Sequence, residues 1–266
     1  MKLSIVSDEL SDDFETAVEI GVSWQLRAFE LRNAWMSRVP NITSTEITVI
    51  KRVIEEYGIT LTTLSPGLFK IPLRSEAMEN HKDGLLRKSF DLARELGTSK
   101  ITVFGIRRSS RDSEEDYRKV LQIIGEAVTL AESEGFTLIL ENEAGWWADT
   151  GTNTAKIVGD IGSRALKINW DPGNAFAAGE TPYPDGYEAV REVVANVHIK
   201  QAVRDVKNNL HYLKPSGGYL DLKGQLEALT EDGFDGYVAV ETHNKPRIEK
   251  SRECLELIRE VGVDCL

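Results

Sequence analysis

Four side chains of metal-ligating types each follow a short apolar run in the second half of the chain. They are Glu141 after TLIL, Asp171 after LKINW, His198 after VANV and Glu241 after YVAV. In a parallel sheet the strands read as continuous apolar runs, so a polar residue directly after each run lies at the carboxyl end of the sheet. Three carboxylates meeting there would repel one another unless a cation neutralised much of their charge. These residue types therefore predict a site for one divalent metal ion, Mn²⁺, Mg²⁺ or Zn²⁺.

Such a site has a definite chemistry. A cation with open coordination positions could chelate a hydroxy-ketone and polarise its carbonyl, and it would stabilise the enediolate formed when the neighbouring proton is removed. Glu141 and Glu241 are the predicted pair that removes and returns this proton; the alternative is that they only bind the metal, because ligation lowers basicity. Lys200 is a predicted catalytic residue that could stabilise the developing negative charge, with a salt bridge to a nearby acid as the alternative.

Eight apolar runs of strand length alternate with segments of helical spacing and would position these residues. Thr45–Tyr57 and Leu85–Leu96 each place apolar residues on one stripe of a helix. The alternation predicts an α/β fold, a (β/α)₈ TIM barrel that forms a single domain over residues 1–266, with a doubly wound open sheet as the alternative. The predicted strands are Leu3–Val6, Gln25–Leu31, Thr60–Leu64, Lys100–Phe104, Thr137–Leu140, Ala165–Trp170, Asn196–Ile199 and Tyr237–Val240.

Four segments of the chain resemble the signatures of a known family. LILENE, NWDPGNA, VHIKQA and VAVETH are similar to those of the xylose isomerase-like TIM barrels, the sugar phosphate isomerase/epimerase superfamily, and the resemblance runs over essentially the whole chain. It implies a divalent ion held by Glu141, Asp171, His198 and Glu241, with Lys200 beside the substrate. The superfamily also holds ketose 3-epimerases, hydroxypyruvate isomerase, inosose dehydratase and isomerase, and endonuclease IV.

The chain departs from the family pattern at three positions. Many members carry His two residues after the first Glu and three residues after the Asp, where this chain has Glu143 and Asn174. Many also carry Asp after the lysine of the HIK pattern, where this chain has Gln201. The predicted metal ligands are unaffected, but the identity of the substrate does not transfer from the family.

Six residues in the loops after the predicted strands are candidate substrate contacts. Trp146 could lie against the apolar face of a sugar, and Arg107 could hold a phosphate or carboxylate, with plain polar surface as the alternative. Lys214, in a loop rich in Pro and Gly, could belong to a lid or to an ordinary turn. The complete set is Glu143, Asn174, Trp146, Arg107, His243 and Lys214.

Composition narrows the class of partner. With 43 acidic against 32 basic side chains the net charge is -11, which disfavours binding to nucleic acid or to an anionic membrane. No apolar run reaches membrane-spanning length, and the start of the chain does not read as a signal peptide, so we expect a cytoplasmic protein with reduced cysteines at Cys254 and Cys265. A homo-oligomer is a further expectation.

These features predict a metal-dependent isomerase or epimerase of a sugar, keto-sugar or polyol. One alternative is a lyase of the inosose dehydratase type, in which the same enediolate loses a β-hydroxyl. A zinc endonuclease of this fold would need many histidines and a basic groove for DNA. The chain has only four histidines and a net charge of -11, which disfavours that function. The other alternative is a barrel that binds a sugar without catalysis, although such a protein would have little reason to keep a complete set of mutually repelling acids.

Overall fold

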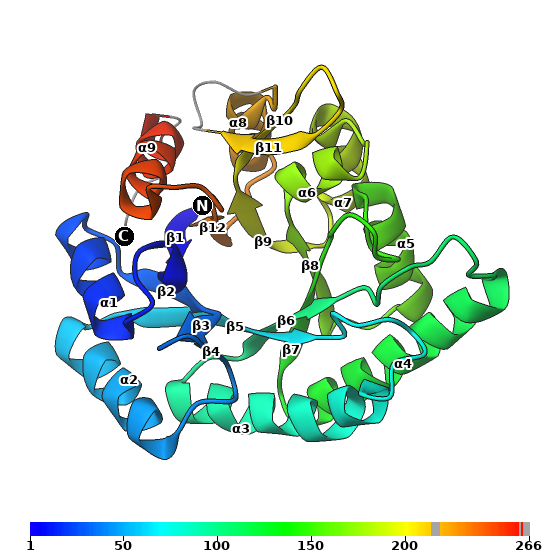
Figure 1. Cartoon of the computed structure of the whole chain (residues 1–266), viewed down its shortest axis with the longest axis horizontal. Coiled ribbons are helices and arrows are strands. Elements are labelled where there is room, and N and C mark those ends of the chain that lie inside the picture. Colours follow the sequence, from blue (N-terminus) through cyan, green and yellow to red (C-terminus); the bar gives the residue numbers. More distant parts are fainter. Residues whose placement is uncertain (214–218, 261, 263–266) are drawn as a thin grey trace.

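Eight parallel strands close into a barrel with helices around its outside (Figure 1), which confirms the predicted fold. The computed structural model describes residues 1–213, 219–260 and 262, so Lys214 lies outside the described residues. The barrel strands are β1 (Lys2–Val6), β2 (Ala28–Leu31), β5 (Thr60–Leu68), β6 (Lys100–Phe104), β7 (Thr137–Glu141), β8 (Leu166–Trp170), β9 (Val194–Ile199) and β12 (Tyr237–Val240).

The helices surround this barrel in the order expected of strand–helix alternation. β1 pairs with β12 on one side and with β2 on the other, so the sheet has no free edge and the open-sheet alternative is wrong. The helices are α1 (Phe14–Ser23), α2 (Ser44–Tyr57), α3 (Leu86–Leu96), α4 (Glu114–Ser133), α5 (Gly151–Ile161), α6 (Pro172–Ala177), α7 (Tyr187–Val190), α8 (Leu222–Glu231) and α9 (Arg247–Glu260).

Two strand boundaries differ from those predicted by more than two residues. The second strand does not begin at Gln25, because that residue has a φ of 67°, in the left-handed region that a strand does not use; β2 begins at Ala28. The third strand does not end at Leu64 but continues through Ser65 to Leu68. The sequence there contains Pro66, which is unusual inside a strand and hid the continuation.

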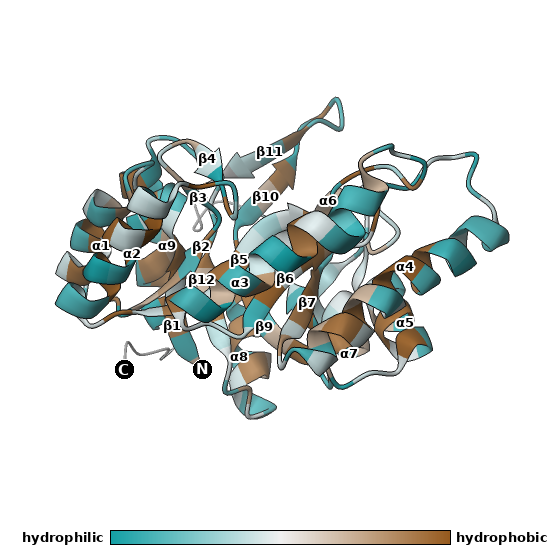
Figure 2. Cartoon of the chain, turned by 90° about the horizontal axis from the view of Figure 1, so that it is seen from below, coloured by the Kyte–Doolittle hydropathy of each residue, from teal (hydrophilic) through white to brown (hydrophobic). Residues whose placement is uncertain are grey.

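Helix boundaries follow from local hydrogen bonds. The Thr43 side chain accepts from the backbone N–H of Glu46, whose carboxylate accepts from the Thr43 backbone in return, and Ser113 and Asp116 do the same at the start of α4. Gly58 ends α2 in the left-handed conformation that glycine adopts without steric cost. Figure 2 shows α2 and α4 with both hydrophilic and hydrophobic residues, as expected of helices with one face on the barrel.

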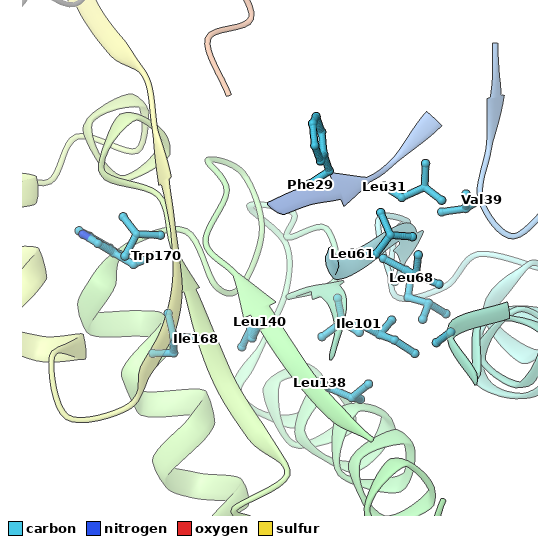
Figure 3. Close-up of a cluster of buried hydrophobic side chains, with 14 of the residues drawn as sticks. Phe29, Leu31, Val39, Leu61, Leu68, Ile101, Leu138, Leu140, Ile168 and Trp170 are labelled. Carbon is cyan, nitrogen blue, oxygen red and sulfur yellow. The ribbon is translucent and has the colours of Figure 1, made fainter. Parts of the chain in front are cut away.

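The strands are apolar on their outer face and polar at several inner positions. Leu138, Leu140, Ile168 and Trp170 are completely buried in the layer between the strands and the helices (Figure 3). Because successive side chains point to opposite faces of a strand, the residues between and after them, such as Asn169, face the barrel interior. The interior therefore carries polar groups directly below the carboxyl ends of the strands.

Two small antiparallel sheets that the sequence did not predict lie on the same side of the barrel (Figure 2). One pairs β3 (Asn33–Ala34) with β4 (Ser37–Arg38), and the other pairs β10 (Gln201–Arg204) with β11 (Leu210–Leu213). Trp35 and Met36, between β3 and β4, both have positive φ, as a tight two-residue hairpin turn requires. Within the described ranges, no helix is both long enough and apolar enough to cross a lipid bilayer.

Candidate metal centre

The four residues singled out by the sequence lie together in the mouth of the barrel. Each offers a potential ligand atom, and these atoms all lie within 4.8 Å of one another. The four residues are 0–5% exposed and come from the carboxyl ends of β7, β8, β9 and β12. Carboxylate and imidazole donors in this number suit Zn²⁺, Mn²⁺ or Mg²⁺, so the donor set fits one divalent ion. The four are Glu141, Asp171, His198 and Glu241.

Asp171 is held in place by hydrogen bonds to its backbone and its side chain. It is the N-cap of α6, where its Oδ1 accepts from the backbone N–H of Asn174 at 2.8 Å, with Pro172 next in the chain. The side chain of Asn142 accepts from the Asp171 backbone N–H and donates to the Asp171 carbonyl, both at 2.8 Å. The other carboxylate oxygen, Oδ2, lies 2.6 Å from the Lys200 ammonium.

His198 lies between a buried carboxylate and the other ligand candidates. Its Nε2 is 2.9 Å from Glu30 Oε2, and its Nδ1 is 3.2 Å from Glu241 Oε2. Burial alone would lower the pKa of His198, but the charges of Glu30 and Glu241 raise it well above its usual range. Because Nε2 is engaged by Glu30, Nδ1 is the nitrogen that faces the ligand oxygens, as in the carboxylate–histidine–metal arrangement of many metalloproteins.

A chain of side-chain amides joins Glu30 to Glu141 across the barrel interior. Asn196 donates to Glu30 Oε1 at 2.7 Å and to Asn169 Oδ1 at 2.9 Å, and Asn169 in turn donates to Glu141 Oε2 at 3.0 Å. Burial raises the pKa of Glu141 to about 7, despite the opposing positive charge of His198. Glu141 therefore combines a fixed geometry with the ability to hold a proton near neutral pH.

One lysine and one arginine contact Glu241. Lys200 is only 1% exposed, and its Nζ lies 2.9 Å from Glu241 Oε2 and 2.6 Å from Asp171 Oδ2. Arg32 forms an ion pair with Glu241 and contacts both oxygens of Asp8 at 3.1 Å. Burial would raise the pKa of Glu241, but the charge of Lys200 holds it well below its usual range. The salt bridge considered for Lys200 is present, and its partners are two of the four ligand candidates.

A cavity of about 100 Å³ lies over these residues and contains several of the candidate substrate contacts. Glu143, Asn174 and His243 line it. Arg107 and Trp146 do not: Arg107 is exposed, and its guanidinium lies 5.9 Å from the centre of the Trp146 ring. A larger hollow of about 400 Å³ between α6 and α8 contains none of the four ligand candidates.

Several cavity residues escaped the sequence analysis. Lys70 pairs with Glu143 at 2.7 Å and lies 4.4 Å from the centre of the Phe104 ring. Its place in the mouth would have been evident if the third strand had been predicted to continue to Leu68. Arg38 and Tyr212 come from the two small antiparallel sheets, whose strands of two to four residues give no periodic signal.

Comparison with known proteins gives one family and several similar folds. A family model described as Xylose isomerase-like TIM barrel matches residues 14–261. An uncharacterized protein of Methanocaldococcus jannaschii, MJ1311, is 30% identical over 142 residues, which is 52% of this chain and 47% of that protein. The chain thus spans about half the length of this relative.

Solved structures share the fold at low sequence identity. The IOLI protein with a binding zinc atom has a TM-score of 0.80 at 18% identity, with 98% of each chain covered. The probable 3-DHS dehydratase AsbF of Bacillus anthracis has a TM-score of 0.79 at 17% identity, covering 97% of this chain and 98% of that one. A D-allulose 3-epimerase from Methylomonas sp. in complex with D-allulose has a TM-score of 0.77 at 14% identity, covering 98% and 96%.

Proposed function

Because the chain belongs to the xylose isomerase-like TIM barrel family, we propose that it is a divalent-metal-dependent isomerase or epimerase of a sugar, keto-sugar or polyol. The observation that carries the proposal is the buried set of four ligand candidates at the carboxyl end of the barrel, where active sites of this fold are built. Similar folds that bind zinc or D-allulose support it.

The proposed ligands are Glu141, Asp171, His198 through Nδ1, and Glu241. An ion bound there, Mn²⁺, Mg²⁺ or Zn²⁺, would supply a Lewis acid that polarises the carbonyl of a hydroxy-ketone. Asn174 and His243 line the cavity, where their polar atoms can bind substrate hydroxyl groups. Burial of the site excludes bulk water, which strengthens each of these polar contacts.

The proton transfer is assigned to the two glutamates. Glu141 on β7 and Glu241 on β12 are separated by β8 and β9 around the barrel, so their carboxylates approach the substrate from different directions. Burial raises the pKa of Glu141 to about 7, whereas Lys200 keeps Glu241 ionised. A bound ion would lower the pKa of both carboxylates, and Glu141, as the more basic of the two, is the proposed proton carrier. The Lys200 ammonium would stabilise negative charge on the substrate oxygen during the transfer.

The test is exchange of a substrate proton with solvent. Metal-stripped protein is incubated in deuterium oxide with a panel of ketoses, keto-inositols and their phosphates, with and without Mn²⁺, and deuterium in the substrate is followed by NMR. We expect metal-dependent exchange that Glu141→Gln and Glu241→Gln abolish and that Glu56→Gln, on the exposed face of α2, leaves unchanged. Exchange that persists in both variants would contradict the assignment.

A lyase is the second candidate, because AsbF, a probable 3-DHS dehydratase, shares the fold. The same experiment separates the two, since a lyase product lacks one hydroxyl group and gains a carbon–carbon double bond or its keto tautomer. Metal binding without exchange of any substrate would instead favour a sugar-binding barrel. The expected cytoplasmic location and homo-oligomer stay predictions, as do contacts of Arg107, Trp146 and Lys214 with substrate.

A further inference from the structure

The cavity over the metal centre is lined by four cationic side chains, and three of them are neutralised by carboxylates. Lys70 pairs with Glu143, Lys200 pairs with two ligand candidates, and Arg32 contacts three acids. The fourth cation is Arg38. Among the residues that the structure describes, no carboxylate lies at ion-pair distance from its guanidinium.

Arg38 is held in the cavity wall by neutral groups. Its Nε donates to the Ser65 carbonyl at 2.9 Å, and its Nη2 donates to Ser65 Oγ at 3.0 Å. A Cβ added to Gly67 would lie 3.1 Å from Arg38 Nε, so the glycine leaves the space that the guanidinium occupies. Burial lowers the pKa of Arg38, and the like charge of Arg32 acts in the same direction. A cation in this position is desolvated without the compensation of a counter-ion.

Metal binding would leave the positive charge of Arg38 even less compensated. Glu141 and Glu241 are among the acids whose negative charge favours the ionised form of Arg38. A divalent ion on the ligand set would neutralise much of that charge. The guanidinium has five N–H donors, and two are used by Ser65. The rest remain available to a planar or tetrahedral anion, which guanidinium binds in bidentate fashion.

We propose that Arg38 binds an anionic group of the substrate, a carboxylate or a phosphate, so that the site takes an acidic or phosphorylated hydroxy-ketone in preference to a neutral one. The inference rests on the proposed function, because it takes the metal centre as the place where the hydroxy-ketone binds. The hairpin formed by β3 and β4 carries the specificity-determining residue.

Three small probes with the same hydroxy-ketone group test the proposal: dihydroxyacetone, dihydroxyacetone phosphate and hydroxypyruvate. Their dissociation constants are measured by calorimetry on Mn²⁺-loaded wild type, Arg38→Met and Arg38→Lys. We expect Arg38→Met to weaken binding of at least one anionic probe about ten- to hundredfold, the usual loss of a charge-assisted hydrogen bond, and to leave binding of dihydroxyacetone unchanged. Arg38→Lys keeps the charge without the planar fork and should lose less.

Arg52→Met is the matched control, since Arg52 is exposed on α2 and pairs with Glu15 and Glu56. The better-bound anionic probe distinguishes a carboxylate from a phosphate. Equal binding of neutral and anionic probes to the wild type, equal losses of all probes in Arg38→Met, or failure of both anionic probes to bind would each overturn the proposal.

Deuterium exchange measured in the same samples distinguishes a failure of the proposed function from a failure of the proposed role of Arg38. If metal-dependent exchange depends neither on the charge of the substrate nor on Arg38, that result supports the proposed function and refutes the role of Arg38. An anionic preference that depends on Arg38, with no exchange of any probe, supports the anion site and counts against the proposed reaction.

Discussion

Glu30 is the side chain whose removal tests the metal centre most directly. It is 1% exposed, and its two oxygens contact His198 Nε2 at 2.9 Å and Asn196 Nδ2 at 2.7 Å. Glu30→Gln keeps the size and one carbonyl oxygen but removes the negative charge that orients the imidazole and increases its basicity. We therefore expect metal to bind to a less well positioned His198 in this variant.

The expected loss of metal affinity follows from the usual effect of removing a residue that hydrogen-bonds a metal ligand without contacting the metal. Loss of such a residue usually weakens metal binding about 10- to 100-fold, which corresponds to about 1.4–2.7 kcal/mol. At metal concentrations well above both dissociation constants, the same amount is lost from the metal-induced stabilisation of the folded protein. For a barrel of this size one kcal/mol shifts Tm by about 2–4 °C, so the metal-induced rise in Tm should be about 3–10 °C smaller in Glu30→Gln.

The assay is thermal unfolding with and without Mn²⁺ or Zn²⁺, accompanied by calorimetric measurement of metal affinity. Glu56→Gln, a change of the same chemistry on an exposed helix face, is the control and should not alter the metal-induced shift. Imidazole ¹⁵N NMR of the zinc-loaded wild type should place the proton of His198 on Nε2 and the metal on Nδ1. A metal-induced rise in Tm that is the same in Glu30→Gln and wild type would refute the reasoning.

Three further predictions concern stability and reactivity. Asn142→Ala should lower the free energy of unfolding by about 2–4 kcal/mol in denaturant titrations, because both backbone groups of Asp171 lose their buried partner. The pKa of Asp116 is held at about 2, below its usual 3.8, first of all by the backbone N–H of Ser113, so its stabilising contribution is complete above the usual value and lost as pH falls toward 2. The stability difference between wild type and Asp116→Asn should therefore shrink over that range in urea titrations. Burial raises the pKa of the Cys254 thiol, so in a Cys265→Ser background it should react with a thiol reagent only when the protein unfolds.

The barrel and the ligand candidates could be predicted because burial on both faces makes each parallel strand an unbroken apolar run. The polar residue that ends a run, such as Asp171, then marks the mouth of the barrel. The position of Glu30 could also have been predicted from the sequence of its strand. It lies between Phe29 and Leu31, which are both completely buried. The alternation of side chains in a strand places Glu30 on the inner face if its neighbours face the helices.

The partners of these residues could not be predicted, because they depend on contacts between distant parts of the chain. Arg32 and Glu241 are 209 residues apart and meet only when the barrel closes between β1 and β12. Arg38 reaches the cavity from a strand of two residues, which is too short to give a pattern. Arg107, by contrast, is a predicted substrate contact, but it is exposed and does not line the cavity.

The ion pairs also make the two proposed acid–base glutamates chemically different. Glu241 contacts Arg32 and Lys200, both of which favour its ionised form. Glu141 receives a hydrogen bond from the amide of Asn169 at 3.0 Å, and within the described part of the chain no lysine or arginine lies at ion-pair distance from it. Burial raises the pKa of Glu141, whereas the charges of Lys200, His243 and His198 outweigh burial at Glu241 and lower its pKa. Two carboxylates with separated pKa values can act as a proton carrier and an anion. If the two glutamates transfer the substrate proton as proposed, Arg32 and Lys200 favour Glu241 as the anion and Glu141 as the proton carrier, so we expect Glu141→Gln and Glu241→Gln to remove different functions.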